Sequence, residues 1–214
     1  MKKPLKYMLT VLAGVIAGVV IASVVYAATG WSLIKRKDEN ASTPADSNRA
    51  ALASLAYSIL GKIKDGDFAA LSQAAHPEYG VVFSPHATIN LVTNKCFTAE
   101  QIAAFGTDTQ LYVWGVYTTG EPIELTPTGY FAQFVTDKDY SNAAVVGINH
   151  IVRSGDALDN IAEVFPDALF IDFCFPGSEN GAGADDGWRS LRLGFEEYEG
   201  ALRLTVILHS QWTG

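Results

Sequence analysis

The first 37 residues contain no acidic side chain, and the stretch from Tyr7 to Ile34 contains no charged side chain of either sign. A helix rises about 1.5 Å per residue, so this stretch is long enough to span a bilayer core of about 30 Å. Basic residues flank it on both sides. We therefore expect residues 1–37 to be an N-terminal membrane anchor or signal segment, which places the rest of the chain outside the cytoplasm.

Cysteine is absent from this segment and from its flank, which excludes a lipoprotein anchor. Val25-Tyr26-Ala27 can serve as a processing site, and cleavage there would release a secreted protein that begins at Ala28. However, the apolar run is longer than the roughly 7–15 residues of a signal peptide. We therefore favour an uncleaved single-pass helix in the cell membrane with the domain outside, and secretion after cleavage is the alternative.

Basic side chains are scarce in the rest of the chain. Six of the fifteen lie at or before Lys37, which leaves nine against 23 acidic side chains from Asp38 onward, a net charge of -14. Such a domain repels the phosphate backbone of nucleic acids, so we expect no nucleic-acid partner. The membrane is the partner that we expect, and the contact is through the N-terminal helix.

The linear motifs of common enzymes are missing. The chain has no G-x-S-x-G, S-x-x-K, P-loop, G-x-G-x-x-G or H-E-x-x-H pattern, so no such motif marks it as a hydrolase, a nucleotide-binding protein or a zinc protein. Asp137-x-Asp139-x-Ser141 begins like a calcium-binding loop, but Asn142 and Ile148 stand where an EF-hand needs Gly and Glu. We expect neither a metal nor a cofactor.

Only two cysteines are present, Cys96 and Cys174. Outside the cytoplasm such a pair can form a disulfide. Closing a loop of about 78 residues would stabilise the fold by roughly 4 kcal/mol in the chain-entropy description. Two free thiols are the alternative.

A polar linker is expected at residues 38–47, followed by a domain at residues 48–214. From about Ser47 to Lys64 the apolar residues recur every three or four positions, which predicts an amphipathic helix. This helix presents one apolar stripe, so it needs another element to cover.

Shorter helices are predicted by their capping residues. Asp67 can cap a second helix, and Thr98 with Gln101 has the spacing of a capping box. Thr126 followed by Pro127 can open another short helix. Beyond these, the chain is rich in strand-forming residues. Strands are expected at about residues 80–83, 110–118, 143–152, 168–175, 188–198 and 201–211.

The last two predicted strands are joined by Glu199-Gly200, a tight-turn pair. On the final strand, alternation predicts that Leu204 and Val206 face one way while His209 faces the other. Helices that cover one apolar face of such a sheet make an α+β fold. We therefore expect helices packed on a curved antiparallel sheet, with its second face open.

Short strings spread over most of residues 50–213 resemble an uncharacterised family of bacterial extracytoplasmic and lipoprotein-like domains. They include His76-Pro77-Glu78, Phe97-Thr98-Ala99-Glu100-Gln101, Gly120-Glu121-Pro122-Ile123, Trp188-x-Ser190-Leu191-Arg192-Leu193 and His209-x-Gln211-Trp212-Thr213. The element order is similar to the cone-shaped, cystatin-like fold of the ketosteroid-isomerase and nuclear-transport-factor superfamily. The resemblance implies that fold and an extracytoplasmic location, and it implies no catalytic residue.

Candidate pocket residues follow from this expected cone. An isomerase-type site needs a carboxylate and a Tyr or His that converge inside it, and Asp172 is one such carboxylate. A polar strand face at the mouth of the cone would add basic side chains, and a tryptophan beside it can stack a ligand. The candidate ligand-binding residues are His76, Tyr79, Tyr112, Arg192, Glu196, His209 and Trp212. For His76 and Trp212 the alternatives are a structural role at a helix end and core packing.

Three hypotheses for function are left open. The first is a non-enzymatic domain at the cell envelope that binds a small molecule or a protein. The second is an isomerase or dehydratase that uses the cone as its active site. The third is a structural module that forms a homodimer through the open sheet. A cavity lined by titratable groups would favour the enzyme, whereas a cone filled with Leu, Phe and Trp would count against it.

Overall fold

The computed structural model describes residues 44–155, 157–177 and 187–212. The predicted anchor or signal segment, residues 1–37, lies outside these described residues. Within them, no helix combines the length and the apolar character that crossing a membrane requires. Residues from Asp46 onward form one compact unit.

The elements follow the order of an α+β fold, which confirms the predicted class. The helical elements are α2 (Pro44–Asp65), α3 (Phe68–Ser72), α4 (Ala99–Ala103), α5 (Pro127–Tyr130), the π-turn η1 (Phe131–Val135), the 3₁₀ turn η2 (Tyr140–Asn142) and α6 (Ile161–Val164). The strands are β1 (Val81–Ser84), β2 (Lys95–Phe97), β3 (Tyr112–Val116), β4 (Pro122–Leu125), β5 (Val145–Ile148), β6 (Leu169–Phe175), β7 (Arg189–Tyr198) and β8 (Ala201–Gln211).

Two short helices begin at the side-chain caps that the sequence predicts. The Asp67 carboxylate accepts a hydrogen bond from the Ala70 N–H at the start of α3. Thr98 and Gln101 form both halves of the predicted capping box on α4. The long helix α2 begins at Pro44, three residues before the expected start at Ser47, so it includes the last four residues of the expected linker. Local polar side chains therefore predict helix starts well, within a few residues.

Six strands form one sheet in the order β2-β1-β8-β7-β6-β5. Most neighbours are antiparallel, but β1 runs parallel to β8, with Val82 opposite Val206. The expectation of a purely antiparallel sheet is therefore wrong at this pair. A parallel pair needs a long connection, and here more than a hundred residues separate the two strands in the sequence. Strands β3 and β4 form a separate hairpin.

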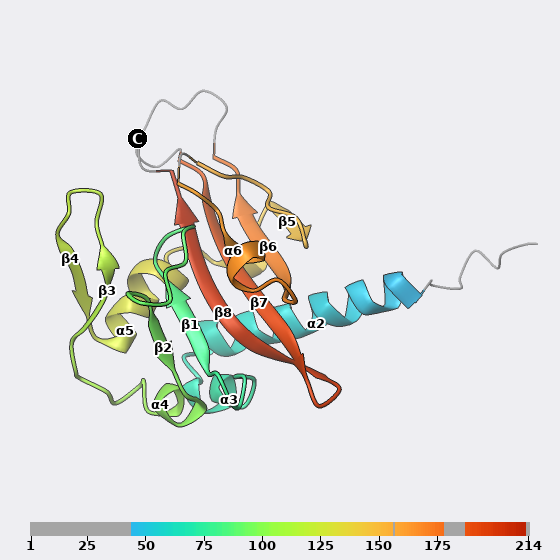
Figure 1. The fold of residues 1–214 in the computed structure, drawn as a ribbon, viewed down its shortest axis with the longest axis horizontal. Coiled ribbons are helices and arrows are strands. Elements are labelled where there is room, and N and C mark those ends of the chain that lie inside the picture. Colours follow the sequence, from blue (N-terminus) through green and yellow to red (C-terminus); the bar gives the residue numbers. More distant parts are fainter. Residues whose placement is uncertain (1–43, 156, 178–186, 213–214) are drawn as a thin grey trace, which may run out of the picture. The chain divides into compact units, whose positions relative to one another are not determined.

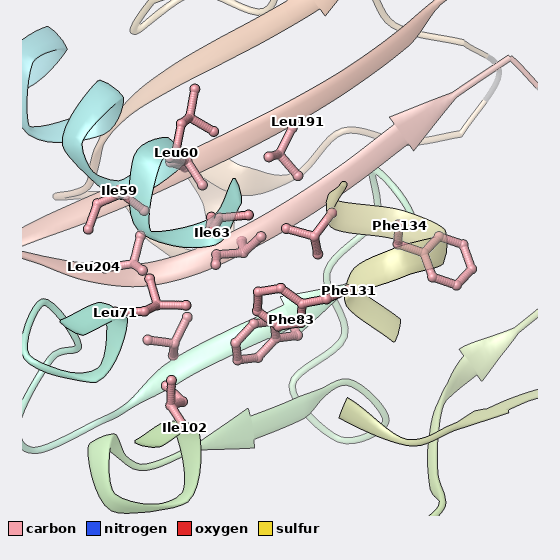
Figure 2. Packing of buried hydrophobic residues seen from close by; sticks show 14 of the residues in the cluster. Ile59, Leu60, Ile63, Leu71, Phe83, Ile102, Phe131, Phe134, Leu191 and Leu204 are labelled. Atoms are coloured by element: carbon pink, nitrogen blue, oxygen red, sulfur yellow. The ribbon is translucent and has the colours of Figure 1, made fainter. Parts of the chain in front are cut away.

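The main core lies between α2 and one face of the sheet. Figure 1 shows α2 crossing behind β7 and β8. Its buried stripe includes Leu52, Ile59 and Ile63, which belong to one cluster with Leu204 and Phe83 of the sheet. Figure 2 shows Ile59 and Ile63 of α2 directed towards the strands. Burying this stripe is what fixes α2 on the sheet, because helix propensity alone contributes little.

The opposite face of the sheet is covered as well. Ile161 of α6 packs in a second cluster with Phe170 and Leu208. Asn160 ties this cover to the loop after β1, since its side chain accepts from the Ile89 N–H and donates to the Ile89 carbonyl. The expectation of an open second face is therefore wrong for the central strands, which are buried on both sides.

A bulge also changes which residues of β8 share a face. Gly194 pairs with Val206 and Phe195 with Leu204, so Thr205 is an extra residue without a partner across the strand pair. Leu204 packs in the main core, whereas Val206 packs in the second cluster. The simple alternation that put both on one face is wrong because the extra residue reverses it.

The two cysteines do not pair. Cys96 lies on β2 and Cys174 on β6, with β1, β8 and β7 between them. Four steps of about 4.8 Å separate them by about 19 Å, far more than the roughly 4.4–6.8 Å between the Cα atoms of a disulfide. Both are free, so of the two alternatives that the sequence left open, the structure has the two free thiols. Burial and the charge of Asp172 raise the pKa of the Cys174 thiol to about 11.

Candidate functional site

The main core, which α2 and one face of the sheet share with the β3–β4 hairpin and α5, is rich in aromatic side chains. Trp114 stacks on Tyr130 with ring centroids 3.9 Å apart, and Phe83 lies edge-on to both rings. All three side chains are fully buried, and Phe131 and Phe134 pack beside them. This packing leaves the interior of the expected cone as a hydrophobic core.

A groove instead lies at the C-terminal end of β8, beside the β3–β4 hairpin. Its larger arm has a volume of about 620 Å³ and its smaller arm a volume of about 230 Å³. The arms share His86, Tyr117, Thr118 and Gln211, so they form one continuous depression. We call the two arms together the end groove.

Aromatic and basic side chains line the end groove. Trp212 is 50% exposed in the larger arm, whereas Trp188 beside it is nearly buried. Arg153 lines the larger arm and Arg189 the smaller one. Among the described residues that line either arm, none is acidic. The described lining of the end groove is therefore basic, whereas the domain as a whole is strongly acidic.

Backbone contacts fix both walls of the end groove. On one side, His86 Nε2 lies 2.7 Å from the carbonyl oxygen of Val116, which ties the loop after β1 to the end of β3. On the other side, the Trp212 N–H donates to the Trp188 carbonyl at 3.0 Å. A side chain at Gly155 would place its Cβ 3.3 Å from the Trp188 ring. The loop therefore lies close against the tryptophan.

Four polar side chains meet behind the smaller arm and form what we call the Asp137 cluster. Arg189 Nη1 lies 2.8 Å from Asp137 Oδ2, and the Tyr140 hydroxyl donates to Asp137 Oδ1 at 2.9 Å. His209 Nε2 is 3.6 Å from Asp137 Oδ2, and His209 Nδ1 is 3.4 Å from the Pro85 carbonyl. This buried histidine therefore lies between the Asp137 carboxylate and the Pro85 carbonyl.

Charge within the cluster is set by these contacts. Burial raises the pKa of the Asp137 carboxyl, but hydrogen bonds and charge from His209, Arg189 and Tyr140 outweigh it and hold that pKa below its usual range. Burial first, and then the nearby Asp137 charge, raise the pKa of the Tyr140 hydroxyl. Asp137 is therefore ionised at neutral pH and holds the guanidinium of Arg189 in place at the groove wall.

A second ionic cluster lies on the opposite sheet face, beneath α6. Arg192 is fully buried, and its Nη1 lies 2.5 Å from Asp159 Oδ2 while its Nη2 lies 3.4 Å from Asp172 Oδ2. Ser190 donates to Asp172, and so does the Val152 N–H at 2.8 Å. These groups are enclosed by the protein, so they stabilise the cover of the sheet rather than reach a ligand.

The structure does not bring the seven predicted pocket residues together. Trp212 lines the end groove, and His209 lies behind it in the Asp137 cluster. Arg192 is buried on the other sheet face. Glu196 lies opposite Arg203 further along the β7–β8 pair.

His76 and Tyr79 do lie together, but at the other end of β8, where the His76 N–H donates to the Leu204 carbonyl. Their rings stack with centroids 4.5 Å apart. His76 Nδ1 accepts from the N–H groups of Glu78 and Tyr79 at 3.3 and 3.2 Å. These contacts fit a structural role for His76.

Tyr112, the seventh predicted residue, lies on β3 outside both arms of the groove. Its hydroxyl donates to Asp108 Oδ2 at 2.9 Å. This hydrogen bond, followed by burial and the charge of Asp108, raises the pKa of the Tyr112 hydroxyl. The contact closes the turn that leads into the hairpin.

Sequence reasoning missed Arg153, Arg189 and Tyr117 as groove residues. A usable signal was present for one of them, because the Glu199-Gly200 turn fixes the register of the last two strands. Counting back from that turn places Arg189 opposite Ser210, and the bulge at Thr205 moves its partner by one residue to Gln211. Arg153 lies in the long connection between β5 and β6, so no local sequence signal predicts that it lines the groove.

A second hollow of about 530 Å³ lies at the C-terminal end of α2. Its floor includes Ile63 and Phe131, and the Lys64–Asp139 ion pair of 2.8 Å lies at its rim. Lys64 is 61% exposed and Asp139 39% exposed. This hollow has an apolar floor and weakly held charges, so it offers fewer directed polar groups than the end groove.

Across the described parts of the chain, no three His, Cys, Asp or Glu side chains are grouped so that they could hold a metal ion. No protein-family model, no curated protein and no solved structure matches this chain, so its function has to be argued from the geometry.

Proposed function

We propose that this chain is a membrane-anchored, extracytoplasmic domain that binds a small ligand in the end groove without transforming it. The observation that carries the proposal is a contrast between two spaces. The main core is packed with buried rings, whereas the end groove is open and presents aromatic, basic and hydrogen-bonding side chains. Binding sites for small molecules commonly combine such features.

The proposed location and family rest on the sequence. The uncharged stretch from Tyr7 to Ile34 supports the anchor, with secretion after cleavage as the alternative. The cone-shaped fold of the ketosteroid-isomerase superfamily, and with it the extracytoplasmic family, is supported by one long helix laid across the sheet. The bulge at Gly194 and Phe195 supports it further, since bulges bend strands.

The other two hypotheses receive less support. An isomerase or dehydratase would need an open interior, but Trp114, Tyr130 and Phe83 fill it. A dimer through an open sheet face would need an uncovered face, but α2 and α6 cover opposite sides of the central strands. Binding in the end groove needs neither condition.

Filling the end groove tests the proposal. Thr118 is exposed, lies in both arms and follows the end of β3, so Thr118→Trp blocks the groove without entering the core. Thr119→Trp adds the same bulk at a neighbouring exposed position that lines neither arm. Saturation-transfer NMR would screen a set of ring-containing fragments against the full chain in uncharged detergent micelles, with empty micelles as the blank.

We expect fragments that bind the unchanged chain and Thr119→Trp, and whose signal disappears with Thr118→Trp. Fragments that bind Thr118→Trp as strongly as the unchanged chain would place the ligand elsewhere. A screen in which no fragment binds above the micelle blank would also contradict the proposal.

A further inference from the structure

We infer that the ligand of the end groove is a small organic acid in which a flat ring carries a carboxylate, with Arg153 as the group that binds the carboxylate. This inference rests on the proposed function and names the chemical class of its ligand. It is carried by an exposed guanidinium that has no carboxylate partner among the described residues, by the charge of the described groove lining, and by the rings beside it.

Most N–H donors of the Arg153 guanidinium are not used by the described chain and can bind a ligand. It is exposed in the larger arm, and within the described chain it donates from Nη1 to the Pro176 carbonyl. No described carboxylate lies within ion-pair distance of it, whereas Arg189 and Arg192 are both paired with aspartates. A guanidinium carries five N–H donors in a planar fork that matches a carboxylate.

The surroundings of Arg153 favour an anion. The domain from Asp38 onward has a net charge of -14, so most of its surface repels negative ligands. The end groove differs because its described lining contains two arginines and no acidic side chain. Arg189, with a side chain 30% exposed, is paired with Asp137 behind the smaller arm, so Arg153 supplies the unpaired positive charge among the described lining residues. A negative ligand is therefore drawn to this groove rather than to other parts of the domain.

Rings on the groove wall favour a flat apolar partner for that carboxylate. Trp212 is half exposed in the same arm as Arg153. Tyr117 lies where the arms meet, and its hydroxyl accepts a hydrogen bond from Gln133 Nε2 at 2.9 Å, which holds the ring in place. Aromatic side chains stack on flat apolar faces, and a volume of about 620 Å³ accommodates one ring with its substituents.

Isothermal titration calorimetry with two pairs of probes tests this class. Benzoate is compared with benzyl alcohol, and glucuronate with methyl glucoside, each titrated into the full chain in uncharged detergent micelles. The first pair presents a flat aromatic ring and the second a puckered sugar ring, so benzoate should bind more tightly than glucuronate, and the reverse order would contradict a flat ring. We expect the acid to bind at least tenfold more tightly than its neutral counterpart, and more weakly as salt is added.

Variants then assign the effect to Arg153. Arg153→Gln should raise the Kd of the acid roughly tenfold, as expected for one lost charge-assisted hydrogen bond, and leave the neutral probe unchanged. Arg153→Lys should recover part of the affinity because it keeps the charge but loses the fork. Arg49→Gln, which removes an exposed charge from α2 outside the groove, is the matched control and should change nothing.

The outcomes separate this inference from the proposed function. If acids and neutral probes bind equally well and Arg153→Gln has no effect, while Thr118→Trp still abolishes binding, the acid class is overturned and the groove remains the site. If Thr118→Trp does not change the Kd of the probes, both the inference and the proposed function fail.

Discussion

At the scale of single residues, Asp137 connects the core to the end groove. Its carboxylate accepts from Tyr140 and pairs with Arg189, and His209 lies 3.6 Å away. The side chain is only 8% exposed, so removing its charge would leave the guanidinium of Arg189 without its carboxylate partner in a poorly solvated place. The position of Arg189 at the groove wall therefore depends on one buried carboxylate.

Replacing Asp137 tests this dependence. Asp137→Asn should lower the free energy of unfolding at pH 7 by about 2–3 kcal/mol, because the partners lose a charged acceptor. Urea unfolding of the full chain in micelles measures it. Asp139→Asn, which removes an exposed carboxylate from a surface ion pair, is the control and should change stability little.

The pH dependence of the same variant follows from the lowered pKa of Asp137. A carboxyl whose pKa is lower in the folded state stabilises the protein above its unfolded pKa of about 4. That stabilisation is lost as the pH falls through the lower folded pKa. The gap between the unchanged chain and Asp137→Asn should therefore shrink below about pH 4. A gap that persists undiminished at pH 2 would contradict this account.

At the scale of elements, the entry of β1 depends on a close approach of two backbones. Gly80 has φ of +73°, and a Cβ there would lie 2.3 Å from the Phe97 carbonyl oxygen of β2. Gly200, in the β7–β8 turn, has a similar φ of +78° but no atom within 4 Å of an added Cβ. The two glycines therefore share a backbone conformation and differ in their surroundings.

This pair separates backbone strain from steric clash. Gly200→Ala should cost about 1–2 kcal/mol of unfolding free energy, the strain of a side chain at positive φ. Gly80→Ala should cost about 3 kcal/mol or more, because β2 must also move away. Thermal and urea unfolding of both variants measure the difference. Equal costs would show that β1 and β2 do not approach as closely as the structure has them.

Elements whose signals are local could be predicted from the sequence. The caps at Asp67 and Thr98 and the turn at Glu199-Gly200 act through neighbouring backbone groups, so a short stretch of sequence contains the whole cause. The parallel pairing of β1 with β8 depends on partners more than a hundred residues apart. The bulge at Thr205 is set by packing on both faces of the sheet, so strict alternation failed there.

The candidate site was harder to predict than the fold for the same reason. Trp212 was named from its position beside the last strand, and it lines the end groove. Arg153 and Tyr117 come from separate connections, and no sequence period relates them to Trp212. His76 and Arg192 were named because their chemistry is common at active sites, yet both are engaged in buried structural contacts.

At the scale of the whole molecule, charge and packing point to the same place. The domain is strongly acidic, its central strands are covered on both faces, and its helix–sheet interior is a packed core. The end groove combines open volume, rings and basic side chains. The account therefore claims that ligands enter the end groove and leave the interior untouched.

The tryptophans report on that claim most directly. Trp188 and Trp212 line the end groove, whereas Trp114 is fully buried and donates from Nε1 to the Leu125 carbonyl at 2.9 Å. In the full chain labelled with ¹⁵N-tryptophan, each indole N–H signal can be assigned by a Trp→Phe variant. On titration with the tightest fragment, the account predicts that the Trp188 and Trp212 signals shift while the Trp114 signal stays in place. A shift of Trp114 with Trp188 and Trp212 unmoved would contradict it.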